Sequence, residues 1–156
     1  MKVIISGSSG FIGKNLTTYL SKSGHDITRL VRNAQYNDPS YKTVYWNPER
    51  NIVSPDLFNG FDAIIHLGGA SLLSPRWTSQ KKRQIKNSRV KSTTLVANSI
   101  AELPNPPKKL IVASATGFYG DTSDEITGET GKCGSGFLAN TAKNWEDSSS
   151  TAKKNG

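Results

Sequence analysis

The feature that most constrains this chain is a set of three glycines spaced three residues apart. The stretch ISGSSGFIG contains Gly7, Gly10 and Gly13 directly after a short apolar run. That run is β-branched and predicts a buried strand over 2–6. Apolar residues then recur every four positions, which predicts a helix over 11–23 with a buried stripe of Ile12, Leu16 and Leu20. Such a glycine loop can be a simple tight turn, because turns collect glycines for conformational reasons.

The rest of the chain alternates in the same way between strand and helix patterns. Further strands are expected over 26–31, 42–46, 61–67 and 108–115. Helices are expected over 78–102 and 137–150, the last with Leu138 and Trp145 on its inner side. This alternation predicts an α/β fold, a Rossmann doubly wound parallel sheet of about five strands with helices on both faces. Right-handed crossovers place the first strand centrally and put ligands at the carboxyl ends of the strands.

This context makes the glycine loop a candidate phosphate site. A glycine triplet that follows a strand and opens a helix inside a βαβ unit is the setting of dinucleotide binding. Gly7 permits the tight turn, Gly10 lets the backbone approach a pyrophosphate, and Gly13 lets helix and strand pack closely. The free N–H groups and the dipole of the helix then favour a negative ligand.

The end of the second strand predicts which dinucleotide is bound. An acidic residue there binds the ribose 2′-hydroxyl of NAD, whereas an arginine accommodates the 2′-phosphate of NADP. The stretch TRLVRN offers Arg29 and Arg32, and Asp26 lies at the other end of the strand. The pattern favours NADP(H), with NAD(H) possible. The alternative interpretation is that both arginines are only surface charges.

The formal net charge of +8 comes largely from a basic block over residues 76–91. A basic block can bind nucleic acid or another polyanion. Stacking aromatic residues are not interleaved in it, since only Trp77 is near. The pattern favours a solvated helix face, and polyanion binding through 76–91 is a less favoured alternative.

Other features restrict the class of protein. The length of 156 residues predicts one domain over 1–156. The one cysteine, Cys133, cannot form an intrachain disulfide, which suits a reducing cytoplasm, where we expect the protein. No run approaches the roughly 20 apolar residues of a membrane span, and the early glycines are unlike a signal peptide. The spacing of His25, His66 and Cys133 matches neither a catalytic triad nor a metal site. His66 lies in an apolar strand pattern and is expected to be a packed core residue.

Five segments together resemble the short-chain dehydrogenase/reductase superfamily: GSSGFIG, FDAIIHLGGAS, RWTSQKKRQIKNSRVKSTTLV, SATGFYG and WE. The chain is most similar to the extended branch of sugar-nucleotide epimerases, and within it to an atypical subgroup described as NAD-dependent epimerase/dehydratase-like. The resemblance covers essentially the whole chain. It implies a dinucleotide cofactor, a small-molecule substrate, and cofactor contacts from Gly7, Ser8, Ser9, Gly10, Phe11, Ile12, Gly13, Val31, Arg32, Leu67, Gly68, Gly69, Gln84 and Arg89.

The catalytic residues of the extended branch have no match here. That branch uses a Ser/Thr, a general acid/base Tyr, and a Lys four residues later that lowers the pKa of the tyrosine. Aligned on the WE pair, the tyrosine position falls on Leu138 and the lysine position on Ala142, with Lys143 one residue off. The remaining hydroxyl candidates are Ser114, Thr116 and Tyr119, although a packed tyrosine is the alternative interpretation for the last.

Members of this superfamily usually continue into a C-terminal substrate-binding portion. We therefore expect a truncated nucleotide-binding portion whose fifth strand leaves an exposed edge, which makes a homo-oligomer plausible. Two readings of function follow, since fold alone does not decide. One is an atypical NADP-dependent oxidoreductase or epimerase. The other is a non-catalytic dinucleotide-sensing or scaffold module, supported by the missing Tyr and Lys.

Overall fold

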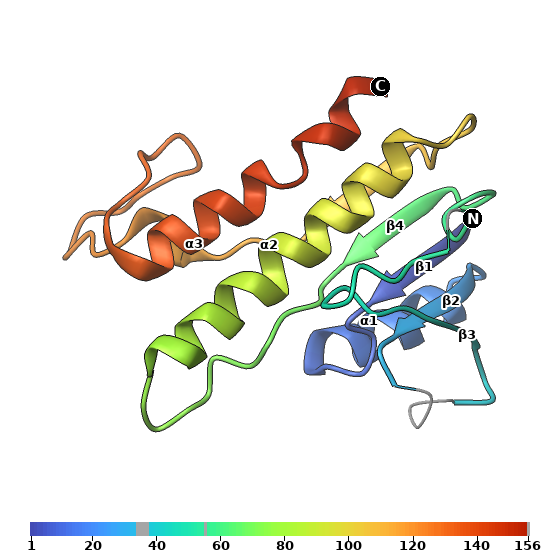
Figure 1. The fold of residues 1–156 in the computed structure, drawn as a ribbon, viewed down its shortest axis with the longest axis horizontal. Coiled ribbons are helices and arrows are strands. Elements are labelled where there is room, and N and C mark those ends of the chain that lie inside the picture. The colour runs from blue at the N-terminus through green and yellow to red at the C-terminus, as the bar shows by residue number, and fades with distance from the viewer. Residues whose placement is uncertain (34–37, 55, 156) are drawn as a thin grey trace.

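The computed structural model describes residues 1–33, 38–54 and 56–155. Strands and helices alternate along the chain (Figure 1). The elements are β1 (Lys2–Ser6), α1 (Phe11–Lys22), β2 (Asp26–Val31), β3 (Lys42–Tyr45), β4 (Ala63–His66), α2 (Ser79–Ala101), β5 (Lys109–Val112), the 3₁₀ helix η2 (Thr116–Tyr119), α3 (Gly136–Asp147) and the 3₁₀ helix η3 (Ser150–Asn155). The predicted strands and helices are therefore present, with the fourth and fifth strands shorter at both ends.

The strands form one parallel sheet in the order β3-β2-β1-β4-β5. Ser6, the last residue of β1, pairs with Leu30 on one side and with His66 on the other. The carboxyl ends of these three strands consequently lie level with one another. This confirms the predicted α/β fold with β1 in the centre, and it puts the glycine loop between the ends of β2 and β4.

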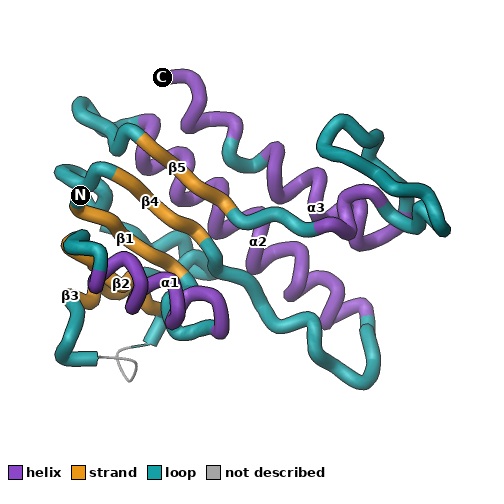
Figure 2. Tube along the Cα trace, turned by 180° about the vertical axis from the view of Figure 1, so that it is seen from behind, coloured by secondary structure: helices purple, strands orange, loops and turns teal. Residues whose placement is uncertain are grey.

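Helices cover the two faces of the sheet unequally (Figure 2). Helix α1 packs on β1 and β2, while α2 and α3 lie side by side on the opposite face. The core under α2 is the larger one and contains Ile4, Leu30, Ile64, Val96 and Ile100 among its residues. Full burial of such aliphatic side chains stabilises a fold by about 1.5–3 kcal/mol each. The packing of α2 is thus a main source of stability.

Two side chains predicted to be inward lie outward instead. Ile12 is 66% exposed, because Gly13 and Thr17 occupy the line along which α1 contacts its surroundings, and one residue along a helix turns a side chain by about 100°. Leu138 is 43% exposed, whereas Ala142 and Trp145 face the core. Leu16 and Leu20 do pack against the α1-side core as predicted.

Strand β5 is one edge of the sheet, with β3 at the other edge, and Ile111 on β5 is half exposed. This agrees with the expected exposed edge, and self-association through it stays a prediction. Across the part of the chain that the structure describes, no helix is both long enough and apolar enough to cross a membrane.

Candidate functional site

A cleft of about 1360 Å³ lies at the carboxyl ends of β1, β2 and β4. One wall is the N-terminal half of α2, which extends past the ends of these strands (Figure 1). The other walls are the loops that follow the four strands β1 to β4. The sequence-predicted residues that line the cleft are Gly7, Ser9, Gly10, Val31, Arg32, Leu67, Gly68, Gly69 and Gln84.

The glycine loop forms a tight turn between β1 and α1, in which the N–H of Gly10 donates to the carbonyl oxygen of Gly7 at 3.0 Å. Gly7 adopts φ +72°, and a Cβ there would lie 2.8 Å from the carbonyl carbon of Leu67. A Cβ on Gly13 would lie 2.2 Å from the carbonyl oxygen of Gly7, so this position packs the helix against the loop. A Cβ on Gly10 would meet only that same oxygen, at 3.3 Å, and it borders the cleft. Gly7 therefore forms the turn and Gly13 packs the helix against the loop, while Gly10 is open to the cleft and its role towards a pyrophosphate stays a prediction.

The first turn of α1 leaves its N–H groups available to an anion. No side chain caps this helix, and no acidic residue lies in its first turn. The first N–H groups of any helix lack acceptors within the helix, and the helix dipole favours negative charge there. Phe11 and Ile12 lie in this turn with side chains that are largely exposed. Their side chains do not line the cleft, so any contribution to phosphate binding comes from their backbone.

The two arginines of β2 occupy different environments. Arg32 is exposed and lines the cleft. Arg29 is buried, and its Nε donates a hydrogen bond to Oγ of Ser8 at 3.1 Å. Its Nη1 pairs with the carboxylate of Asp38 at 3.3 Å. Ser8 is itself buried. Of these two arginines, Arg32 is the one that borders the cleft, and any contribution of Ser8 to ligand binding comes from its backbone.

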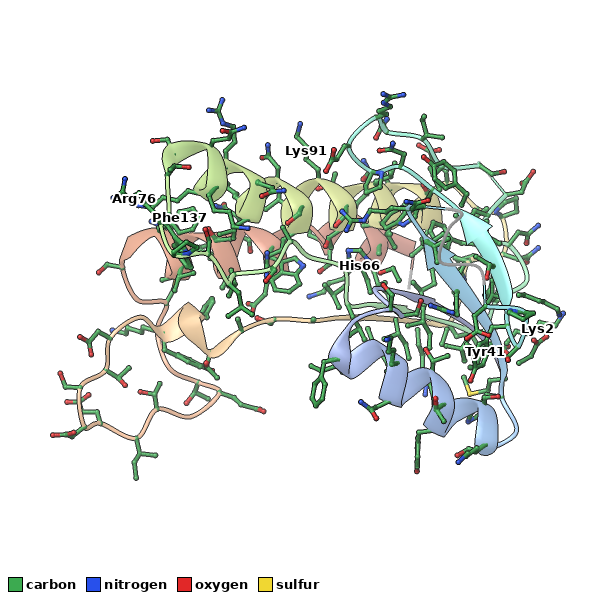
Figure 3. All side chains as sticks on the ribbon, turned by 90° about the horizontal axis from the view of Figure 1, so that it is seen from below. Lys2, Tyr41, His66, Arg76, Lys91 and Phe137 are labelled. Atoms are coloured by element: carbon green, nitrogen blue, oxygen red, sulfur yellow. The ribbon has the colours of Figure 1, made fainter. Side chains whose placement is uncertain are left out.

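The end of β4 is held by a buried histidine. His66 lies at the end of β4 (Figure 3). Its Nδ1 lies 2.5 Å from Oγ of Ser6, and its Nε2 lies 2.9 Å from Oγ of Ser92 on α2. Ser92 already donates to the carbonyl oxygen of Ser88 at 2.7 Å. The geometry therefore assigns the proton of His66 to Nε2, with Nδ1 accepting from Ser6. Burial lowers the pKa of His66 to about 4, so the ring is neutral at pH 7. This confirms the expected packed histidine.

Arg89, on α2, holds the loop after β4 through hydrogen bonds to the backbone. Its Nη1 donates to the carbonyl oxygens of Ala70 at 3.1 Å and of Ile85 at 3.2 Å. The guanidinium carbon lies 5.2 Å from the ring centre of Trp145 on α3. A Cβ on Gly69 would lie 3.1 Å from this guanidinium, so the loop and the arginine are in close contact. Burial lowers the pKa of Arg89. Arg89 is not part of the cleft wall, whereas Gln84 is.

The hydroxyl candidates for catalysis lie outside the cleft. The hydroxyl of Ser114 donates to the carboxylate of Glu146. Thr116 and Tyr119 belong to η2, where the Tyr119 ring stands edge-on to Phe118 at 5.4 Å. None of these three hydroxyl residues is among those that line the cleft.

Leu138 and Ala142, which we expect at the positions of the usual catalytic tyrosine and lysine, are apolar residues, and this assignment stays a prediction. The neighbouring Lys143 pairs with Asp147 at 2.7 Å, and this hydrogen bond raises the pKa of Lys143. The ammonium group of Lys143 thus forms an ion pair on the protein surface with a residue one turn further along α3. In addition, the described residues contain no group of three or more His, Cys, Asp or Glu side chains that could bind a metal ion.

Much of the cleft wall was not predicted from the sequence. Besides the predicted Gln84, the same face of α2 contributes Gln80, Asn87 and Lys91. The four positions are spaced by four, three and four residues, as a single helix face requires. Part of the basic block, Lys81, Arg83 and Lys91, also lines the cleft, so that block is more than a solvated face. Residues 46–49, directly after β3, also line the cleft and were not predicted. The helical spacing was readable in the sequence, but nothing local showed which face of α2 meets a cleft.

Comparison with known proteins assigns the chain to a family. Residues 3–142 match the family model described as NAD dependent epimerase/dehydratase family. An epimerase family protein of Mycobacterium bovis is 34% identical over 154 residues, which is 99% of this chain and 50% of the relative. The epimerase family protein YfhF of Bacillus subtilis is 34% identical over 94% of this chain and 48% of its own length. The chain thus spans about half the length of these curated relatives.

Solved structures agree with the sequence comparison. The nucleoside-diphosphate sugar epimerase of Corynebacterium glutamicum superposes with a TM-score of 0.80 at 34% identity, covering 99% of this chain and 31% of that one. The human epimerase family protein SDR39U1, crystallised with NADPH, superposes with a TM-score of 0.81 at 28% identity, covering 96% of this chain and 48% of that one.

Proposed function

Since the chain belongs to the NAD dependent epimerase/dehydratase family, we propose that its cleft binds a nicotinamide dinucleotide, with NADP(H) preferred over NAD(H). The observation that carries the proposal is the position of Arg32. It lies at the end of β2 and lines the same cleft as the glycine loop. An arginine at this position accommodates a ribose 2′-phosphate. The human relative that was crystallised with NADPH supports the same choice.

The residues present fit such a cofactor. In the proposal, the diphosphate lies against the glycine loop and the first turn of α1, where Gly10 leaves space that a side chain would fill. The adenosine lies between Val31 and the segment Trp46–Glu49, next to Arg32. The rest of the dinucleotide follows Leu67, Gly68 and Gly69 past Gln84. Ser8, Phe11 and Ile12 contribute backbone, Gly13 packs the helix, and Arg89 holds the loop after β4.

We propose binding without the family's usual proton-transfer pair. Bound NADP(H) supplies a hydride at its nicotinamide ring. A general acid/base must also be within hydrogen-bond reach of the substrate. Leu138 and Ala142 provide no such group, and Lys143 is paired with Asp147. This favours a dinucleotide-sensing or scaffold role for the chain as it stands. An atypical oxidoreductase or epimerase is the alternative for a longer parent protein.

The test is calorimetric titration of the 156-residue chain with NADP⁺ and with NAD⁺, repeated on Arg32→Ala. We expect the wild type to bind NADP⁺ at least tenfold more tightly than NAD⁺, and Arg32→Ala to remove that difference while leaving NAD⁺ affinity unchanged. Arg50→Ala is the matched control, because Arg50 is exposed and lies outside the cleft wall. Equal affinity of the wild type for both dinucleotides would contradict the assignment of Arg32.

A further inference from the structure

Arg29 is a buried arginine inside the sheet. It sits in β2, paired with Ile5 of β1 and Thr43 of β3, and is 7% exposed. Its neighbours on this face, Ile5 and Ile27, belong to the apolar core on the α1 side of the sheet. A charge in such a place is costly unless partners satisfy it. The hydrogen-bond and ion-pair partners of Arg29 therefore show which segments of the chain its guanidinium group connects.

The first partner belongs to the glycine loop. Nε of Arg29 donates to Oγ of Ser8 at 3.1 Å, and Ser8 is 2% exposed. On its other side Ser8 meets α1, since a Cβ on Gly13 would lie 2.7 Å from Cα of Ser8. The loop is thus fixed between the first turn of α1 and the guanidinium of Arg29. Because Ser9 and Gly10 line the cleft directly after Ser8, this contact sets the position of the loop backbone.

The second partner follows the end of β2. Nη1 of Arg29 pairs with Oδ2 of Asp38 at 3.3 Å. The other carboxylate oxygen of Asp38 accepts from the backbone N–H of Ser40 at 3.0 Å, and hydrogen bonds from Ser40, more than the charge of Arg29, lower the pKa of Asp38. The guanidinium also lies 6.0 Å from the ring centre of Tyr41, which packs on the α1 side of the sheet (Figure 3). Asp38 comes six residues after Arg32, so Arg29 also holds the chain that continues from the ribose side of the cleft.

We propose that Arg29 is a positioning residue that couples the two halves of the dinucleotide site. It joins the glycine loop, which faces the diphosphate, to the segment 38–41 that follows the ribose-recognition end of β2. The inference rests on the proposed dinucleotide function of the cleft. A planar guanidinium bonds two acceptors through separate N–H groups in a fixed geometry, which a lysine ammonium does not reproduce. A disturbance of one segment is therefore transmitted to the other through a single rigid group.

Amide hydrogen exchange of the ligand-free chain tests this coupling directly. Ser8→Ala should raise exchange in the glycine loop and also in 38–41. Asp38→Asn, which keeps an acceptor for Ser40, should raise exchange in 38–41 and also in 7–13. Arg29→Met should raise both, and adding either other substitution to it should change little more. Arg50→Met, an exposed arginine away from these contacts, is the matched control and should leave both segments unchanged.

Binding measurements give the functional readout. Inorganic pyrophosphate probes the loop alone, and Asp38→Asn should weaken its binding at least threefold although Asp38 is not in the loop. Arg29→Lys should not restore wild-type affinity. Effects confined to the substituted segment, or a wild-type exchange pattern in Arg29→Met, would overturn the coupling. Should Arg29→Met not fold, the cross-effects of Ser8→Ala and Asp38→Asn decide alone. If exchange in the two segments is coupled but NADP⁺ does not bind, only the proposed function is contradicted. If NADP⁺ binds but exchange in the two segments is not coupled, only the role of Arg29 is contradicted.

Discussion

Ser6 and His66 end two neighbouring parallel strands, and the Oγ of the one lies 2.5 Å from Nδ1 of the other. The same imidazole reaches Ser92 of α2 through Nε2. One neutral ring thus joins β1, β4 and α2 directly beneath the cleft. This arrangement depends on the protonation state of the ring, because a protonated Nδ1 can no longer accept from Ser6.

Stability should fall as the pH is lowered from about 6.5 to about 4. The pKa of His66 drops from 6.5 to about 4 on folding, so between these values the unfolded chain binds a proton that the folded chain does not. The difference corresponds to about 3 kcal/mol, and it stops growing below pH 4. Urea unfolding at pH 7.5, 6 and 5 measures it. His66→Asn should lose this part of the pH dependence, whereas His25→Asn should keep it; identical pH profiles for wild type and His66→Asn would refute the assignment.

Substitution of two glycines in the loop should affect two different properties, stability at Gly13 and NADP⁺ binding at Gly10. Gly13→Ala forces a Cβ to within 2.2 Å of a backbone oxygen and should destabilise the fold by about 2 kcal/mol or more. Gly10→Glu places its side chain in the cleft, where it fills the diphosphate space and adds like charge. It should abolish NADP⁺ binding with little loss of stability. Thermal unfolding and calorimetry separate the two effects, and retained affinity in Gly10→Glu would disprove the loop assignment.

The contact between Arg89 and Trp145 should contribute measurable coupling between α2 and α3. The guanidinium carbon lies 5.2 Å from the ring centre, in the range of cation–π attraction. A double-mutant cycle of Arg89→Met and Trp145→Leu should give a coupling free energy of about 1 kcal/mol in urea unfolding. The control cycle combines Trp145→Leu with Arg83→Met, because Arg83 is an exposed residue at the cleft wall, and these two substitutions should be additive. Additivity of the first pair would mean that the two groups act independently.

The fold was predictable because its signals are local. Each strand is a short apolar run, and the glycine triplet marks the first crossover. Burial within a helix was predicted less well, since Ile12 and Leu138 satisfy the periodicity but lie on the outer side. Which side of a helix is covered depends on its neighbours, and these come from distant parts of the chain.

The same limit applies to the site. The spacing identified the residues next to the strand ends, such as Gly10 and Arg32, whose position follows from topology. It could not show that Arg29 is buried and bonded to Ser8, or that Lys91 faces the cleft. Those relations join segments that lie far apart in the sequence. The type of a side chain indicated which interactions it can make, but only the packing of the fold showed which partners it has.

The basic residues of α2 should divide by face in their effect on NADP⁺ binding. Lys91 lines the cleft and projects from α2 (Figure 3), whereas Lys86 is exposed and lies outside the cleft wall. Lys91→Ala should therefore weaken NADP⁺ binding about three- to tenfold, roughly 1 kcal/mol, and reduce its salt dependence. Lys86→Ala removes the same charge from the same helix and should change neither. Calorimetric titrations at about 50 and 200 mM salt provide the comparison. If both variants weaken binding equally, the effect comes from net charge, and the cleft-facing position of Lys91 has no special role.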